Sequence, residues 1–147
     1  MRNGIILLVE DSPDDEALTL RAMKRNNILN DVVVARDGAE ALDYLFRIGP
    51  YASRPEEPLP EVILLDLNLP KMSGLEVLQA IRANPLTKLT PVIILTTSNE
   101  DRDRLGSYEL GANSYIQKPV DFNRFSEVIR QLGIYWLLVN TGPAGGR

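Results

Sequence analysis

Side chains suited to phosphoryl chemistry follow four short apolar segments of this chain. Glu10 and Asp11 follow Ile5–Val9, Asp66 follows Val62–Leu65, Thr96 follows 92–95, and Lys118 follows 115–117. If the apolar segments are parallel strands of one sheet, their carboxyl ends lie side by side, where open α/β folds bind ligands. Three carboxylates, a hydroxyl and an ammonium would then converge on one cleft. This combination suits Mg²⁺ and a phosphoryl group, and little else.

The residues that the chain lacks narrow its chemistry further. There is no cysteine, which excludes disulfides, thiol catalysis and Cys-ligated zinc. There is no histidine, which excludes Ser-His-Asp triads, His-ligated metals and a phosphohistidine on this chain. Chemistry must therefore come from carboxylates, hydroxyls, lysine and an ion that prefers oxygen ligands.

Composition is that of an ordinary globular protein. The 147 residues fit one domain, with 44% apolar and 24% charged residues. The net charge of −4 argues against nucleic-acid binding, which would need a basic face. No apolar run approaches the length of a membrane span, and the N-terminus lacks the regions of a secretory signal. We therefore expect a cytoplasmic protein that binds neither nucleic acid nor membrane.

Strand and helix patterns alternate five times along the chain. The predicted strands are 5–9, 31–35, 62–66, 91–96 and 114–117, and the predicted helices are 13–27, 39–47, 74–83, 101–110 and 123–139, the last with a break near Gly133. Strands separated by helices pair in parallel through right-handed crossovers, which gives a three-layer sandwich. We expect an α/β fold of the flavodoxin-like (βα)5 type, with a five-stranded sheet of order 2-1-3-4-5.

The sequence predicts a single domain followed by a short tail. Residues 1–140 form one domain with an extended last helix, and 141–147 form a flexible, Gly-rich tail. The stretch 49–60 holds four prolines and is interpreted as an extended loop before the third strand, not as a domain linker. No room remains for a second domain, so no output domain is expected.

The acidic residues after the first strand divide into two pairs. Glu10 and Asp11 stand at the strand end, where Asp11 would bind an ion and Glu10 would join it directly or through water. Asp14 and Asp15 are interpreted as a solvated acidic turn, favourable at a helix start that Ser12 caps.

Asp66 ends a buried strand and is the central candidate. On its own, a strand-end Asp is more often a helix cap or a solvated carboxylate, but the matching chemistry at the other strand ends weakens that interpretation. Mg²⁺ takes six oxygen ligands and keeps several waters, so a few carboxylates and a carbonyl suffice to bind it. The backbone carbonyl of Asn68, two residues further on, is a plausible ligand.

Thr96 and Lys118 complete the set. Hydroxyls at strand ends often satisfy only backbone groups, and lysines are often solvated. Beside Asp66, however, the Thr96 hydroxyl could donate to a phosphoryl oxygen, and Lys118 could pair with a carboxylate or a phosphoryl oxygen.

At this point the chain resembles a response-regulator receiver domain, from Ile5 to about Val139. The motifs that carry the resemblance are LVEDS, LLDLNLP, MSG, ILTTS and GANSYIQKP. By position, the resemblance implies these roles: phosphorylated aspartate Asp66, acidic pair Glu10 and Asp11, ion-binding carbonyl Asn68, switch hydroxyl Thr96, switch aromatic Tyr115 and invariant lysine Lys118. Glu10 departs from the Asp that many receivers carry there.

Within the family, the chain resembles single-domain regulators of bacterial and cyanobacterial phytochrome kinases. The segments in question are YLFRIGPYASRPEEPLP, DLNLPKMSG, TTSNED and IYWLLVN. The resemblance implies a two-component response regulator that accepts a phosphoryl group on Asp66, with Mg²⁺, from a sensor histidine kinase, including those of the phytochrome class. It would be no enzyme beyond intrinsic phosphotransfer and autodephosphorylation, and it would signal by conformational change and protein contact.

The apolar end of the last helix predicts a partner. Six apolar residues follow one another in 134–139, and one helical face would bury about half of them. We expect a homodimer through Tyr135, Trp136, Leu137 and Leu138. The alternative is that this segment folds back on its own core.

Three other functions compete with this hypothesis. An FMN-binding flavodoxin would need a hydroxyl- and Gly-rich phosphate loop where 10–15 is acidic. A haloacid-dehalogenase-type phosphatase would need a second Asp where Asn68 stands. A receiver-like module that binds partners without phosphate would retain the same residues, and only an experiment separates it from the phosphoacceptor.

Overall fold

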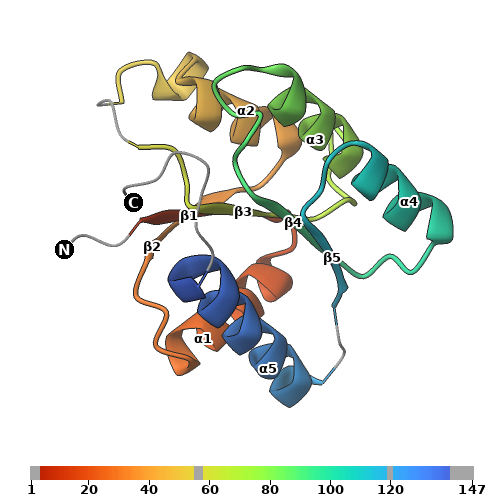
Figure 1. Cartoon of the computed structure of the whole chain (residues 1–147). Helices are drawn as coiled ribbons and strands as arrows, with labels where there is room; N and C mark the ends of the chain where they lie inside the picture. Colours follow the sequence, from red (N-terminus) through yellow and green to blue (C-terminus); the bar gives the residue numbers. More distant parts are fainter. Residues whose placement is uncertain (1–3, 55–57, 119–120, 140–147) are drawn as a thin grey trace.

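Five parallel strands form a single sheet in the computed structural model, which describes residues 4–54, 58–118 and 121–139, with side chains of the last range as far as 137. The strands are β1 (Ile5–Val9), β2 (Asp31–Ala35), β3 (Val62–Leu65), β4 (Val92–Thr96) and β5 (Ser114–Gln117). Their order is β2-β1-β3-β4-β5 (Figure 1). The predicted strand order is confirmed, and each predicted strand agrees with the structure to within one residue.

Helices cover both faces of the sheet, as the three-layer prediction requires. They are α1 (Pro13–Arg25), α2 (Gly38–Phe46), α3 (Gly74–Ala83), α4 (Asp101–Glu109) and α5 (Phe122–Leu132). Figure 1 shows α2, α3 and α4 on one side of the sheet and α1 with α5 on the other. The two sides correspond to two separate clusters of buried apolar residues.

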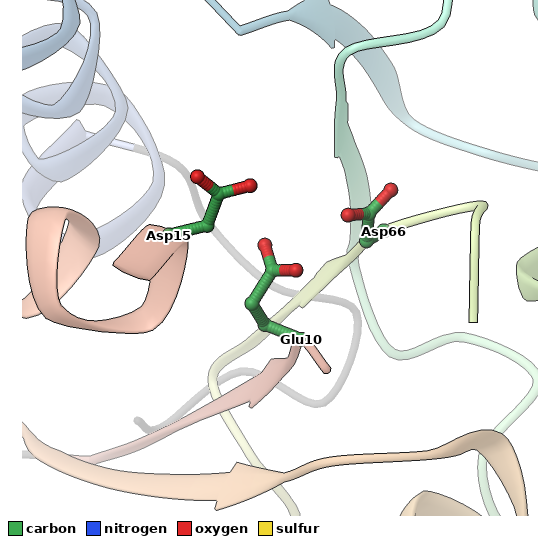
Figure 2. A group of neighbouring side chains, drawn as sticks. All are labelled: Glu10, Asp15 and Asp66. Carbon is green, nitrogen blue, oxygen red and sulfur yellow. The ribbon is translucent and has the colours of Figure 1, made fainter. Parts of the chain in front are cut away.

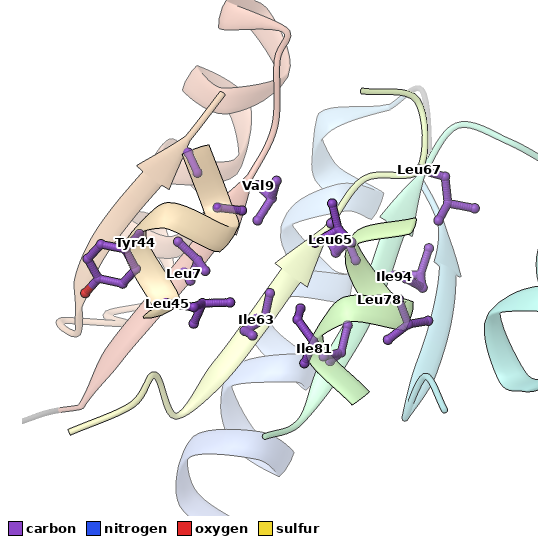
Figure 3. Close-up of a cluster of buried hydrophobic side chains, with 14 residues drawn as sticks. Leu7, Val9, Tyr44, Leu45, Ile63, Leu65, Leu67, Leu78, Ile81 and Ile94 are labelled. Carbon is purple, nitrogen blue, oxygen red and sulfur yellow. The ribbon is translucent and has the colours of Figure 1, made fainter. Parts of the chain in front are cut away.

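Strand β1 shows how the sheet divides the core. Its side chains alternate, so that Leu7 and Val9 pack toward α2 and α3, whereas Ile6 and Leu8 pack toward α1 and α5. Figure 3 shows the first of these clusters, with side chains of β1, β3 and β4 meeting those of α2 and α3. A strand buried on both faces needs an unbroken apolar run, and this is the pattern of Ile5–Val9.

Helix α1 begins directly after residues 10–12, which follow β1. Ser12 is its N-cap, accepting a hydrogen bond from the Asp15 backbone N–H at 3.2 Å, and Pro13 opens the first turn. Helix α3 begins with a capping box in which the Ser73 and Glu76 side chains each accept from the other's backbone N–H. These caps fix where each helix leaves the loop at the end of its strand.

Helix α4 is anchored differently from the others. Ser107 is its only buried residue, whereas Leu105 and Tyr108 on the same helix are exposed. It ends at Glu109, and Gly111, in the position after the C-cap Leu110, has the left-handed backbone (φ +98°) that the predicted C-terminal cap requires.

The proline-rich stretch before β3 is not simply extended, contrary to the prediction. It begins with a short 3-10 helix, Gly49–Tyr51, and the described residues 49–54 contact α2. The Tyr51 hydroxyl donates to Glu40 at 3.0 Å, and Arg54 donates to the Tyr44 carbonyl at 2.7 Å. Proline content indicated an irregular backbone, but the pairing of these side chains with α2 could not be read from composition.

The predicted break near Gly133 is a change of helix type. Helix α5 is followed without interruption by a π-helical segment, Gly133–Val139. A Cβ on Gly133 would lie 2.7 Å from Ile28 Cδ1, so the absence of a side chain lets this segment approach the end of α1. The predicted tail, 141–147, lies outside the described residues.

We predict that Gly74→Ala destabilises the fold by about 1–3 kcal/mol, because the added methyl would overpack rigid surroundings. A Cβ there would lie 2.3 Å from the Asp66 carbonyl oxygen and 2.5 Å from Leu67 Cα, which are backbone atoms that cannot turn aside. The free energy of unfolding in urea measures the effect.

Gly106→Ala is the matched control. Its Cβ would meet only Leu75 Cδ1, at 3.7 Å, and alanine in a helix is favoured over glycine by about 0.5–1 kcal/mol. Equal stabilities for the two variants would contradict the assigned close contact at Gly74.

Candidate functional site

The backbone brings four of the predicted site residues to one edge of the sheet. Val9 is in register with Leu65, and Thr96 with Gln117. One step beyond these pairs, the Asp66 N–H donates to the Val9 carbonyl at 3.1 Å and the Lys118 N–H donates to the Thr96 carbonyl at 2.7 Å. The ends of β1, β3, β4 and β5 are therefore held side by side, as the sequence predicted.

Lys118 is the centre of the site. Its ammonium donates to Glu10 Oε1, to Asp15 Oδ2 at 3.0 Å and to Asp66 Oδ2 at 3.2 Å. Only 6% of its side chain is exposed. An ammonium has three N–H donors, so each of them has a carboxylate partner.

The three carboxylates come from three different elements and point into one space (Figure 2). Glu10 follows β1, Asp15 lies in the first turn of α1, and Asp66 follows β3. One oxygen of each lies within 4.8 Å of the others. With all groups ionised, three carboxylates and one ammonium leave two uncompensated negative charges, which one divalent cation would balance. Carboxylate oxygens are also the ligands that Mg²⁺ and similar hard cations prefer.

Burial raises the pKa of Glu10 to about 7, because it disfavours the charged form. The hydrogen bond from Lys118 opposes this shift, and the nearby charge of Asp66 adds to it. Burial also acts to lower the pKa of Lys118, but the hydrogen bond to Glu10 and the charge of Asp66 outweigh it and raise this pKa above its ordinary value. Lys118 is therefore a permanent cation at neutral pH, whereas Glu10 is held near its titration point.

The structure corrects the division of the acidic residues. Asp15, interpreted from sequence as solvated, contacts Lys118, whereas Asp11 is exposed and is not in the acidic group found among the described residues. The missed signal was positional: only three residues separate the end of β1 from the start of α1, so the first turn of the helix lies close to that strand end. Asp11 stays a predicted ligand, and Asp14 is exposed as expected.

The loop after β3 folds back on Asp66. The Asn68 backbone N–H donates to Asp66 Oδ1 at 3.2 Å, and the Gly74 N–H donates to the Leu67 carbonyl at 2.9 Å. Asn68 itself is exposed. One oxygen of Asp66 thus contacts its own loop, and the other contacts Lys118.

The two predicted switch residues are linked through Ser98. Thr96 is fully buried, and its hydroxyl oxygen accepts from the Ser98 backbone N–H at 3.3 Å. The Tyr115 hydroxyl donates to the Ser98 carbonyl at 3.0 Å, and the Ser98 hydroxyl donates to Asp103 of α4 at 2.6 Å. The loop after β4 therefore joins the site to β5 and to α4.

The predicted dimer residues divide between core and surface. Trp136 and Leu137 pack on the cluster shared by α1 and α5, as the alternative of a folded-back segment expected. Tyr135 is 50% exposed and its neighbour Ile134 is 41% exposed. The side chain of Leu138 lies outside the described residues. Within the part of the chain that the structure describes, no helix is both long and apolar enough to cross a membrane.

We predict that the raised pKa of Glu10 makes the metal-free protein lose stability as the pH rises from about 4.5 to about 7. In that range the folded state binds more protons than the unfolded state, so raising the pH favours unfolding. Relative to Glu10→Gln, the loss should be roughly 1–3 kcal/mol, because one unit of pKa corresponds to about 1.4 kcal/mol. Urea unfolding with a chelator present measures it.

Saturating Mg²⁺ provides the control, because a bound cation favours ionised Glu10 and should abolish the loss. Parallel stability curves for the two metal-free proteins would contradict the assigned environment of Glu10.

Known proteins resemble this chain both in sequence and in structure. The sequence model of the family described as "Response regulator receiver domain" matches residues 6–130. The response regulator Rcp1 of Synechocystis sp. is 40% identical over 140 residues, which cover 95% of this chain and 93% of that protein.

Solved structures of similar proteins cover nearly the whole chain. The phosphorylated cyanobacterial phytochrome response regulator RcpA has a TM-score of 0.88 at 38% identity and covers 96% of this chain and 99% of its own. The Mn²⁺-bound form of Rcp1 has a TM-score of 0.86 at 39% identity, with 95% and 99% covered. The bacteriophytochrome response regulator AtBRR has a TM-score of 0.77 at 50% identity, again with 95% and 99% covered.

Proposed function

This chain belongs to the family of response regulator receiver domains and is a response regulator of the phytochrome type; on that premise we propose that Asp66 accepts a phosphoryl group from a partner histidine kinase. The observation that carries the proposal is the contact of the Asp66 carboxylate with the buried ammonium of Lys118, inside an acidic group. It is a signalling protein and not an enzyme with its own turnover reaction.

Asp66 would act as the nucleophile. A carboxylate is a weak nucleophile, so position and charge compensation must supply the rate. Oδ1 accepts from the Asn68 N–H and Oδ2 from Lys118, and these two hydrogen bonds orient the carboxylate at the carboxyl end of β3. Lys118 would then donate to an oxygen of the phosphoryl group, where charge is spread in the transition state.

The donor must come from outside the chain, because this chain has no histidine. A sensor histidine kinase fits this requirement, and the similarity to Rcp1, RcpA and AtBRR favours a kinase of the phytochrome class. In the transfer, the P–N bond of the phosphohistidine breaks as a P–O bond to Asp66 forms. The imidazole that leaves takes up a proton.

Mg²⁺ is the proposed cofactor. It would be held by the carboxylates of Asp66 and Glu10 and by the Asn68 carbonyl, with Asp11 as the further predicted ligand. When bound, it supplies positive charge opposite the phosphoryl oxygens and so lowers the repulsion between the phosphoryl donor and the carboxylates. Support comes from the two uncompensated negative charges of the site and from the similar Rcp1, which has a Mn²⁺-bound form.

The proposed output is a change in the loop after β4. A phosphoryl oxygen near Asp66 would accept a hydrogen bond from the Thr96 hydroxyl, whose oxygen accepts from the Ser98 N–H, so a shift of Thr96 toward the phosphoryl group would also displace Ser98. Movement of Ser98 would release both the Tyr115 hydroxyl and Asp103 of α4, since both contact Ser98. Thr96 and Tyr115 would thereby bias the surface formed by α4, β5 and α5 between two arrangements.

The domain assignment and the dimer are also proposals. Residues 1–140 would form the receiver domain and 141–147 a flexible tail, in a cytoplasmic protein. The exposed Ile134 and Tyr135 would contact the same residues of a second copy, because a two-fold axis makes each surface its own partner. Trp136 and Leu137 would support that contact from the core side, with Leu138 as the further predicted contact.

We predict that incubation with acetyl phosphate and Mg²⁺ adds one phosphoryl group to the protein, seen by intact mass. The adduct should be absent in Asp66→Asn, which removes the nucleophile, and should not form when a chelator removes Mg²⁺. Asp14→Asn, an exposed acidic residue nearby, should be phosphorylated like the wild type.

An adduct that persists in Asp66→Asn would place the acceptor elsewhere. No adduct in any protein under any condition would favour the interaction module that works without phosphate.

For the dimer, we predict that Tyr135→Glu weakens self-association at least about tenfold, because it places a charge in an apolar contact. Sedimentation velocity over a dilution series measures the dissociation constant. Leu86→Glu, a somewhat more exposed apolar position in the loop before β4, should leave the dissociation constant unchanged. A wild-type protein that stays monomeric throughout the series would refute the dimer.

A further inference from the structure

The ammonium of Lys118 has no donor left for a phosphoryl group. Its three N–H groups are directed at Glu10, Asp15 and Asp66, and its side chain is almost fully buried. For Lys118 to bind a phosphoryl oxygen on Asp66, one of these carboxylates must give up its hydrogen bond. The carboxylate that yields is the one that water can solvate most easily after release and that has the fewest other hydrogen bonds to hold it.

Asp15 is the partner whose loss costs least. Its side chain is 33% exposed, whereas those of Glu10 and Asp66 are 2% and 8% exposed. Water can therefore solvate the released Asp15 carboxylate, but not that of Glu10, whose second oxygen also accepts from the Ser12 N–H. Asp66 is the acceptor itself, and when phosphorus bonds to Oδ1, Oδ2 becomes the carbonyl oxygen of the acyl phosphate and keeps the hydrogen bond from Lys118.

We propose that Asp15 is a positioning residue that holds Lys118 before phosphorylation and yields it to the phosphoryl group. The inference rests on the proposed function of Asp66. When the bond from phosphorus to its donor breaks and the bond to Asp66 forms, one N–H of Lys118 turns from Asp15 to a phosphoryl oxygen. No proton is transferred, because the ammonium keeps all three and only exchanges its acceptor. Asp15 thus competes with the phosphoryl group for a single cation.

Competition between Asp15 and the phosphoryl group for Lys118 predicts the sign of a change in binding affinity. Removing the competing carboxylate should strengthen binding of a phosphoryl group at Asp66, whereas a residue that only shaped the fold would weaken it when removed. A charge-assisted hydrogen bond is among the stronger polar contacts, so we expect a gain of about tenfold in affinity.

Beryllofluoride in saturating Mg²⁺ is the probe, since it occupies the place of a phosphoryl group on a carboxylate. Titration calorimetry should show tighter binding by Asp15→Asn than by the wild type. Asp14→Asn is the matched control, since it removes the same charge from the adjacent exposed position in the same helical turn and should change the affinity less than about twofold. Asp15→Glu keeps a carboxylate and should stay near the wild type.

Each outcome of these titrations supports or overturns the proposed role of Asp15. Unchanged or weaker binding by Asp15→Asn, with a wild type that binds, overturns the inference and leaves the proposed function standing. Equal gains in Asp15→Asn and Asp14→Asn also overturn it, because charge alone would then explain them, as would an equal gain in Asp15→Glu. A wild type that neither binds beryllofluoride nor accepts phosphate refutes the proposed function and this inference with it.

Discussion

A single buried cation determines what this site can do. The Lys118 ammonium has to satisfy carboxylates that arrive from β1, α1 and β3, and it is held in place by a hydrogen bond from its own backbone to Thr96. A buried charge is tolerated only when it is paired, and in this arrangement each of the three carboxylates has a hydrogen bond from the one ammonium. The remaining negative charge makes the same arrangement a receptor for a divalent cation. Structure and chemistry thus depend on the same contacts.

The sheet provides the accuracy that this charge arrangement needs. Register between neighbouring strands places Asp66 beside the end of β1, and the close approach of Gly74 holds the following loop against the Asp66 backbone. Both constraints come from backbone atoms, which vary less in position than long side chains do. The acidic side chains are thereby placed close enough to accept hydrogen bonds from Lys118.

Sequence patterns predicted the fold well because apolar strands and capped helices are local signals. Ile5–Val9 is buried on both faces, and the Ser73 cap with Glu76 marks the start of α3. Patterns also predicted that Glu10, Asp66, Thr96 and Lys118 would meet. They failed at Asp15, because the direction in which a first helical turn faces depends on how the helix packs. They also failed at the stretch around Tyr51, whose contacts with α2 join side chains that no local rule pairs.

Helix α4 buries only Ser107, and few apolar side chains anchor it to the core. Its link to the site through Ser98 and Asp103 is a hydrogen bond, and such bonds contribute only a few kcal/mol even when charged. A helix held in this way lies in the low-stability part of a protein, where amide protons exchange through local opening rather than global unfolding. The chemical state of one carboxylate can therefore change the exchange protection of a whole helix without disturbing the core beneath it.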